Sequence, residues 1–270
     1  VLLGHLDLNN AYKEFLLFPL TIDEIAIFHE DKISFEKSLS FANRDLLSRR
    51  LEENMIYGGY PAVILADNKI EEIKNITQNS VVKDIVNIYD LKNTDLIYNL
   101  LRVLAMQIGN LINIAELASS LKTTTTTIDN YLSILAKNRI IYLLEPYRTN
   151  KRRGYLGRKK VFFYDLGIRN ALIDDFRALN LRSDLGAVFE NLIIMGVLRQ
   201  NIYERNNNKI YYFREISGSQ KEIDLIIETP QGSKTGYEIK LHGGKPNIFP
   251  ELQIAEYGTI SKENAPDFLI

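Results

Sequence analysis

The chain has 270 residues, a length at which two or three hydrophobic cores are more common than one. Hydrophobic residues make up 46% and charged residues 25% of the chain, which excludes global disorder. Cysteine is absent, which excludes disulfides and thiolate zinc sites, and the net charge is only −1. No apolar run approaches the ~20 residues of a membrane-spanning helix. We therefore expect a cytoplasmic, multidomain protein with no membrane partner.

Residues 1–92 are expected to be mostly helical. The chain enters an apolar stretch at once, without an initiator Met, and this predicts a further segment upstream. Thr21 and Glu24 stand at capping-box spacing after Pro19, and further helices are predicted over 43–54 and 71–89. The strong breaker Gly58-Gly-Tyr-Pro61 separates these two helices.

Residues 93–168 are typical of a winged helix-turn-helix. Helices are predicted over 96–108, from Asn113, and over 123–137, and they are followed by strands over 140–144 and 160–164. The polar face of the third helix has no arginine and includes Asp129, so packing against another protein remains an alternative to reading DNA bases.

A strongly basic loop joins the two predicted strands and contains no acidic residue. Lysines and arginines placed against phosphates release condensed counterions, so such a loop favours salt-sensitive, sequence-independent DNA binding. A solvated basic loop is the alternative. The candidate phosphate contacts here are Arg148, Lys151, Arg152, Arg153, Arg158, Lys159 and Lys160.

Residues 169–270 alternate as an α/β unit, with a helix predicted over 186–199 and strands over 209–214, 222–228 and 236–240. If the last hairpin closes symmetrically about Gly232, Asp224 lies opposite Lys240 and shares a face with Glu238. Two adjacent carboxylates suit a bridging Mg²⁺, so Asp224 and Glu238 are candidate metal ligands. Lys240 would then act on the attacking water or the phosphate, although Glu-x-Lys on an exposed strand is usually solvated.

Glu190 is the carboxylate in an otherwise apolar helical run that begins at Gly186. Such a residue either faces solvent at the edge of the helix or is held in a site.

Several short motifs, in this order and spacing, resemble a large prokaryotic family of AAA-type ATPases with a C-terminal domain of unknown function. The resemblance spans nearly the whole chain. The motifs are Phe18-Pro-Leu-Thr-Ile-Asp-Glu-Ile25, Gly58-Gly-Tyr-Pro61, Val82-Lys-Asp-Ile85, Lys160-Val-Phe-Phe-Tyr-Asp-Leu-Gly167, Gly186-Ala-Val-Phe-Glu-Asn191, Phe213-Arg214, Glu222-Ile-Asp224 and Glu238-Ile-Lys240.

The resemblance implies an upstream P-loop ATPase domain as a partner in the same chain. Because G-x-x-x-x-G-K-[ST] is absent here, ATP is expected to bind only the full-length protein. The resemblance also implies that residues 1–92 form an ATPase lid in which Pro61 contacts adenine, although Gly-Gly-Tyr-Pro is by itself only a turn.

The C-terminal domain of the family is similar to PD-(D/E)XK nucleases. This similarity implies catalytic roles for Glu190, Asp224, Glu238 and Lys240, and a phosphate contact for Arg214. Two hypotheses follow: a Mg²⁺-dependent DNA nuclease, or a non-catalytic DNA-binding or protein-binding module of the ATPase, with an oligomer compatible with either. The expected fold is multidomain α+β.

Overall fold

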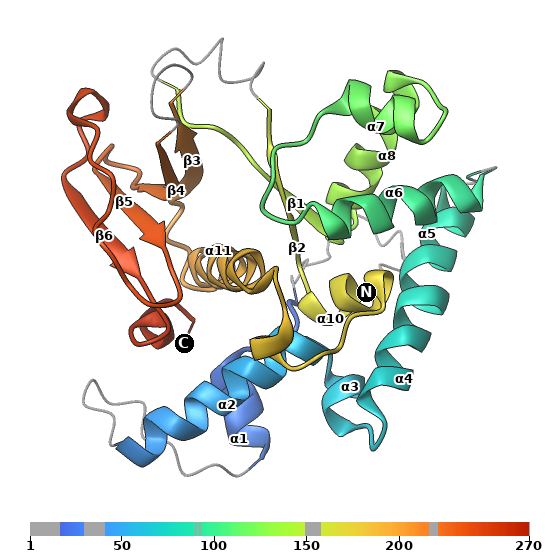
Figure 1. The fold of residues 1–270 in the computed structure, drawn as a ribbon, viewed down its shortest axis with the longest axis horizontal. Coiled ribbons are helices and arrows are strands. Elements are labelled where there is room, and N and C mark those ends of the chain that lie inside the picture. Colours follow the sequence, from blue (N-terminus) through green and yellow to red (C-terminus); the bar gives the residue numbers. More distant parts are fainter. Residues whose placement is uncertain are drawn as a thin grey trace, which may run out of the picture.

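The computed structural model describes residues 17–29, 41–89, 91, 93–148, 158–215 and 221–269. The fold is mixed α+β, with helices over most of the first two thirds and a four-stranded sheet in the last third (Figure 1). Across these ranges, no helix combines the length and apolar character needed to cross a membrane. Lys151, Arg152 and Arg153, at the centre of the predicted basic loop, lie outside the described residues.

The first part of the described chain is mainly helical. Its helices are α1 (Ile22–Phe28), α2 (Phe41–Tyr57), α3 (Pro61–Leu65), α4 (Lys69–Asn75), the π-helical segment η1 (Ile76–Val82) and α5 (Lys83–Ile88). Thr21 and Glu24 form the predicted capping box at the start of α1. The helix predicted over 71–89 is divided by η1, a widened turn in which the Thr77 hydroxyl donates to the Ile73 carbonyl at 2.7 Å.

The elements predicted between 93 and 164 are confirmed. They are α6 (Thr94–Met106), α7 (Ile114–Ser120), α8 (Thr125–Lys137) and the antiparallel strands β1 (Ile141–Leu144) and β2 (Lys160–Phe163). The side chains of Asn113 and Thr124 cap α7 and α8. Helix α8 buries Ile128, Tyr131, Leu132 and Leu135, which recur at helical spacing along one face.

Helix α11 (Leu185–Tyr203) follows α10 (Leu166–Ile173) and the 3-10 turn η2 (Leu179–Leu181). In Figure 1, α11 lies between the four-stranded sheet and the β1–β2 hairpin. Its residues from Val188 to Leu198 are buried almost without interruption, as expected for a helix covered on all sides.

The sheet contains β3 (Lys209–Arg214), β4 (Glu222–Glu228), β5 (Lys234–Ile239) and β6 (Glu256–Ile260), in that order. β3, β4 and β5 are antiparallel neighbours, whereas β6 runs parallel to β5. The β5–β6 connection contains the 3-10 turn η3 (Pro250–Leu252), and η4 (Ala265–Phe268) follows β6. The predicted strands β3 and β4 have the observed bounds, but β6 was not predicted.

The predicted register of the β4–β5 hairpin is wrong by two residues. Leu225 pairs with Tyr237, so Asp224 lies beside Glu238 and not opposite Lys240. The Gly232 N–H donates to the Thr229 carbonyl, so the tight turn is centred before Gly232. A shift of two residues preserves the alternation, and Asp224, Glu238 and Lys240 keep the same side of the sheet.

Two large hydrophobic clusters hold the described elements together. The first cluster contains residues of α1, α2, α11 and the sheet. The second contains residues of every helix from α3 through α8, together with β1 and α10. Strand β2 serves both, because Phe162 belongs to the first cluster while Val161 and Phe163 belong to the second. The predicted boundary at 92/93 runs within the second cluster, and the domain limits 1–92, 93–168 and 169–270 stay predictions.

Candidate functional site

Three carboxylates from two elements meet between α11 and the sheet. Glu190 comes from α11, and Glu222 and Asp224 come from β4. One carboxylate oxygen of each lies within 4.8 Å of the others, and their side chains are only 15%, 23% and 19% exposed. We call these residues the acidic cluster. Oxygen ligands at this spacing are suited to a hard divalent cation.

Local structure fixes each member of the acidic cluster. The Asn191 side chain brackets Phe163 of β2, accepting from its N–H at 2.7 Å and donating to its carbonyl at 2.9 Å. This bracket holds the adjacent Glu190 beside the start of β2. On β4 the period of two places Glu222 and Asp224 on one face. Asp224 Oδ2 also accepts the Ile239 N–H at 2.8 Å, which ties the cluster to β5.

Lys160 enters the acidic cluster from β2. Its Nζ lies 2.8 Å from Glu190 Oε1 and 3.9 Å from Asp224 Oδ1, and it also forms an ion pair with Glu222. The ammonium lies 5.5 Å from the centroid of the Tyr212 ring. A buried cation is therefore already part of the cluster.

The prediction that Lys160 contacts phosphate from an exposed loop is wrong for this structure. Lys160 is only 4% exposed, because it is the first residue of β2 and pairs with Leu144 of β1. Its side chain is directed at α11 and β4 and not at solvent. The sequence grouped Lys160 with the loop because two basic residues, Arg158 and Lys159, directly precede it.

Burial and nearby negative charges raise the pKa values of two carboxylates in the acidic cluster, Glu190 and Asp224. Burial, assisted by Asp224 and Glu222 and opposed by Lys160, raises the pKa of Glu190 to about 7. Burial also raises the pKa of Asp224, again against the attraction of Lys160. For Lys160, burial alone lowers the pKa, but attraction by Glu190, Glu222 and Asp224 outweighs it and raises the pKa. The ammonium is therefore charged at neutral pH.

Glu238 and Lys240 stand beside the acidic cluster but pair with each other. Lys240 Nζ lies 2.9 Å from Glu238 Oε1, and the Lys240 side chain is 46% exposed. Glu238 Oε2 accepts from the backbone N–H and the side-chain amide of Asn247, at 3.2 and 3.0 Å. The structure thus places Asp224 and Glu238 on adjacent strands, with Glu238 held by partners of its own.

The other predicted phosphate contacts are dispersed. Arg158 is exposed and Arg148 is half-buried. Lys159 Nζ forms an ion pair with Glu145 at 3.0 Å. Arg214 reaches the edge of the acidic cluster, with Nε 3.8 Å from Glu222 Oε2.

Glu222 is the site residue that sequence reasoning missed. The Glu-Ile-Asp spacing already placed Glu222 and Asp224 on the same strand face. The residue was passed over because the D…ExK pattern assigns no role to it.

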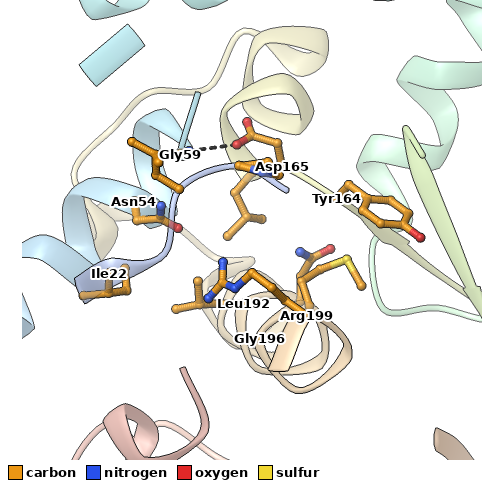
Figure 2. Close-up of a pocket in the computed structure, with 13 residues that line it drawn as sticks. Ile22, Asn54, Gly59, Tyr164, Asp165, Leu192, Gly196 and Arg199 are labelled. Atoms are coloured by element: carbon orange, nitrogen blue, oxygen red, sulfur yellow. Dashed lines mark hydrogen bonds between the residues drawn. The ribbon is translucent and has the colours of Figure 1, made fainter. Parts of the chain in front are cut away.

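Pro61 is exposed at the first turn of α3, where its fixed φ favours helix initiation. The preceding glycines face Asp165, whose Oδ2 accepts the Gly59 N–H at 2.8 Å. Figure 2 shows this bond among the residues that line a small pocket. The cavity has a volume of about 30 Å³, which has room for a water molecule and not for a nucleotide. Pro61 does not line this cavity.

A larger cavity, of about 300 Å³, lies between α2, the 178–185 segment and α11. Its lining is mainly apolar and includes Leu51, Met55 and Phe189. None of the predicted site residues lines it.

Two family models match the chain in succession. The first, Domain of unknown function (DUF8612), covers residues 48–183, and the second, Domain of unknown function (DUF4143), covers residues 185–265. The chain belongs to the DUF8612 family, whose model matches half of its 270 residues. Lys160 falls in the first match, whereas all three residues of the acidic cluster fall in the second.

The curated relatives are uncharacterised proteins. One from Haemophilus influenzae is 27% identical over 231 residues, covering 81% of this chain and 51% of the relative. One from Mycobacterium tuberculosis is 34% identical over 140 residues, with 51% and 30% covered. One from Methanocaldococcus jannaschii is 25% identical over 219 residues, with 78% and 46% covered. The chain thus spans about half or less of the length of these relatives. No solved structure matches it.

Proposed function

We propose that this chain is the DNA-binding, phosphodiester-cleaving part of an AAA-type ATPase, with a divalent-metal site of the PD-(D/E)XK kind. The observation that carries the proposal is the acidic cluster beside the Glu238–Lys240 pair. The site uses two adjacent strands: β4 carries Asp224, and β5 carries Glu238 and is followed by Lys240. Glu190 reaches these residues from α11. All four positions of the nuclease pattern therefore converge between α11 and one end of the sheet.

The donor set fits Mg²⁺. The cluster consists of carboxylate oxygens without histidine or cysteine, and it already attracts one buried cation, the Lys160 ammonium. Glu190, Glu222 and Asp224 would hold the metal. A bound Mg²⁺ would stabilise charge on the phosphate and lower the pKa of a water ligand.

Lys240 is the residue best placed to act on the reacting groups. Its side chain is exposed, and the ammonium is held beside the end of β5 by Glu238, which Asn247 in turn orients. From there Lys240 would orient the attacking water or stabilise the developing negative charge on the phosphate. Glu238 would position Lys240 and complete the negative face of the site.

The DNA-binding half of the proposal rests on α6, α7, α8 and the β1–β2 hairpin. Three helices followed by an antiparallel pair are arranged in the order of a winged helix, with the basic segment between the two strands. Thr125, Thr126 and Asn130 lie on the exposed face of α8. Arg158 at the end of the basic segment is exposed as well.

The link to an ATPase rests on the family resemblance and on length. DUF4143 is common in proteins associated with AAA ATPases. The aligned part of the chain covers only 51%, 30% and 46% of these relatives, which leaves room for an ATPase domain. ATP would then bind the full-length protein only, because the P-loop pattern is absent from this chain.

A non-catalytic DNA-binding or protein-binding module is the second candidate. Lys160 favours it, because an ammonium that partly neutralises three carboxylates can be a purely structural ion pair. In that case Lys240 would only pair with Glu238 at the surface.

Plasmid nicking with Mg²⁺ or Mn²⁺ separates the two candidates. For a nuclease, Asp224→Asn loses metal affinity and cleavage together, whereas Lys240→Ala keeps the metal and loses most of the rate. The assay should be run on this chain and on the full-length protein. If neither form nicks DNA with either metal, the binding module is the better account.

A further inference from the structure

The ion pairs of Lys160 connect the two segments that the family models match. Lys160 belongs to β2, within residues 48–183, and its three carboxylate partners belong to residues 185–265. The side chain of Lys160 is 5% exposed, so its ammonium is withdrawn from water almost completely. Such a charge is retained in a protein only where opposite charges and hydrogen bonds compensate its desolvation.

We propose that Lys160 competes with the divalent cation for the acidic cluster. The Lys160 ammonium occupies the cluster, and the metal binds only when this side chain is displaced. This inference rests on the proposed metal site and adds a control of that site by the β1–β2 hairpin. The relevant contacts are 2.8 Å to Glu190 and 3.9 Å to Asp224, together with the ion pair to Glu222.

Geometry prevents joint occupancy of the acidic cluster. The three ligand oxygens lie within 4.8 Å of one another, so a metal bound to all of them would lie within a few ångströms of the ammonium. A monovalent and a divalent cation at that separation repel each other strongly where little water screens them. Metal binding therefore requires Lys160 Nζ to leave the carboxylates.

The backbone of Lys160 is fixed, so the side chain has to move. Lys160 pairs with Leu144 of β1 and forms a β-bridge with Leu111 on its other side. On either side of it, the Lys159 carbonyl accepts the Ile112 N–H at 2.8 Å, and the Val161 N–H donates to Asn110 at 3.2 Å. The four-carbon stem of lysine allows the ammonium to swing while the strand stays in place.

The position of Lys160 couples this movement to the basic segment. Lys160 is the first residue of β2 and directly follows Arg158 and Lys159, which belong to the predicted DNA contact. The Arg158 carbonyl accepts the Tyr212 hydroxyl at 2.5 Å, and the Tyr212 ring faces the Lys160 ammonium. DNA held against this segment would therefore act on the immediate neighbours of Lys160.

Isothermal titration calorimetry of the chain with MnCl₂ tests the competition. We expect Lys160→Met to bind Mn²⁺ at least tenfold more tightly than the wild type, because the competing ammonium is gone. Lys160→Arg, which keeps the charge, should retain weak binding. Lys74→Met is the matched control, since Lys74 also pairs with a carboxylate, Asp174 at 2.6 Å, and faces an aromatic ring, that of Phe176.

The outcomes distinguish this inference from the proposed function. Equal or weaker Mn²⁺ binding by Lys160→Met than by the wild type would overturn the competition and leave the metal site standing. Absence of binding in both proteins would overturn the competition and the proposed metal site together.

A second measurement uses the wild type alone, in case Lys160→Met does not fold with three uncompensated carboxylates. Acylation of lysines by an N-hydroxysuccinimide ester, quantified by mass spectrometry, reports whether Nζ is accessible. Saturating Mn²⁺ should increase labelling of Lys160 several-fold while labelling of Lys74 stays constant. Unchanged labelling of Lys160 at Mn²⁺ concentrations that saturate the calorimetric signal would overturn the proposal.

Discussion

Asp165 accepts a hydrogen bond from the backbone N–H of Gly59, 106 residues earlier in the chain, at 2.8 Å. The same side chain caps α10 by accepting the Ile168 N–H at 3.0 Å. Two motifs that looked separate in the sequence, Gly58-Gly-Tyr-Pro61 and Tyr164-Asp-Leu-Gly167, therefore form one buried contact. This contact joins the turn before α3 to the junction between β2 and α10.

Gly58→Ala should destabilise the protein by about 2 to 4 kcal/mol. Gly58 has φ +78°, and a Cβ built there would lie 2.2 Å from Asp165 Oδ1. Gly186→Ala is the matched control, because nothing lies within 4 Å of its Cβ position and alanine favours the helix. Urea unfolding gives the free energy of unfolding of both variants. If Gly58→Ala lowers it by no more than Gly186→Ala changes it, the close packing of Gly58 against Asp165 is contradicted.

The free-energy difference between wild type and Asp165→Asn should depend on pH. Burial raises the pKa of Asp165 to about 6 from 3.8, despite its backbone hydrogen bonds to Gly59, Ile168 and Gly167. A carboxyl with a raised pKa contributes its full stability below about pH 4 and loses it as pH rises through 6.

Asparagine does not titrate. The free energy of unfolding of the wild type, relative to that of Asp165→Asn, should therefore fall by up to about 3 kcal/mol between pH 4 and pH 7. Urea unfolding of both proteins at each pH gives the difference, in which other titrating groups cancel. An advantage that stays constant or grows with pH would show that the carboxyl is not destabilised by burial.

Charge reversal at Arg152 and Arg153 should weaken duplex DNA binding and reduce its salt dependence. Each phosphate contact that is lost lowers the slope of log K against log salt by about 0.9, so the double variant should flatten it by at most about two. Lys83→Glu, at an exposed position of α5, is the control and should leave the slope unchanged. An unchanged slope for the double variant would contradict the prediction that the basic loop between β1 and β2 contacts DNA phosphates.

Local signals predicted most elements, because caps, turn residues and hydrophobic periods act over a few residues. Thr21 and Glu24 fixed the start of α1, and alternation fixed the bounds of β4. The hairpin register was wrong because it depends on which residue the turn centres on, here before Gly232.

Lys160 was misplaced for a different reason. Its environment is set by long-range packing: Asn191 brackets Phe163, which brings Glu190 to within 2.8 Å of the ammonium. No local pattern distinguishes this lysine from the basic residues that precede it. Glu190, for which both solvent and a site were open, is paired in the cluster for the same long-range reason.

The location of bound Mn²⁺ tests the central claim, that the acidic cluster is a metal site. Crystals of Lys160→Met soaked in MnCl₂ remove the competing ammonium, and anomalous diffraction locates the metal. We expect an anomalous peak between Glu190, Glu222 and Asp224 that disappears when Asp224→Asn is added. An empty cluster in Lys160→Met, or a peak that survives Asp224→Asn unchanged, would contradict it.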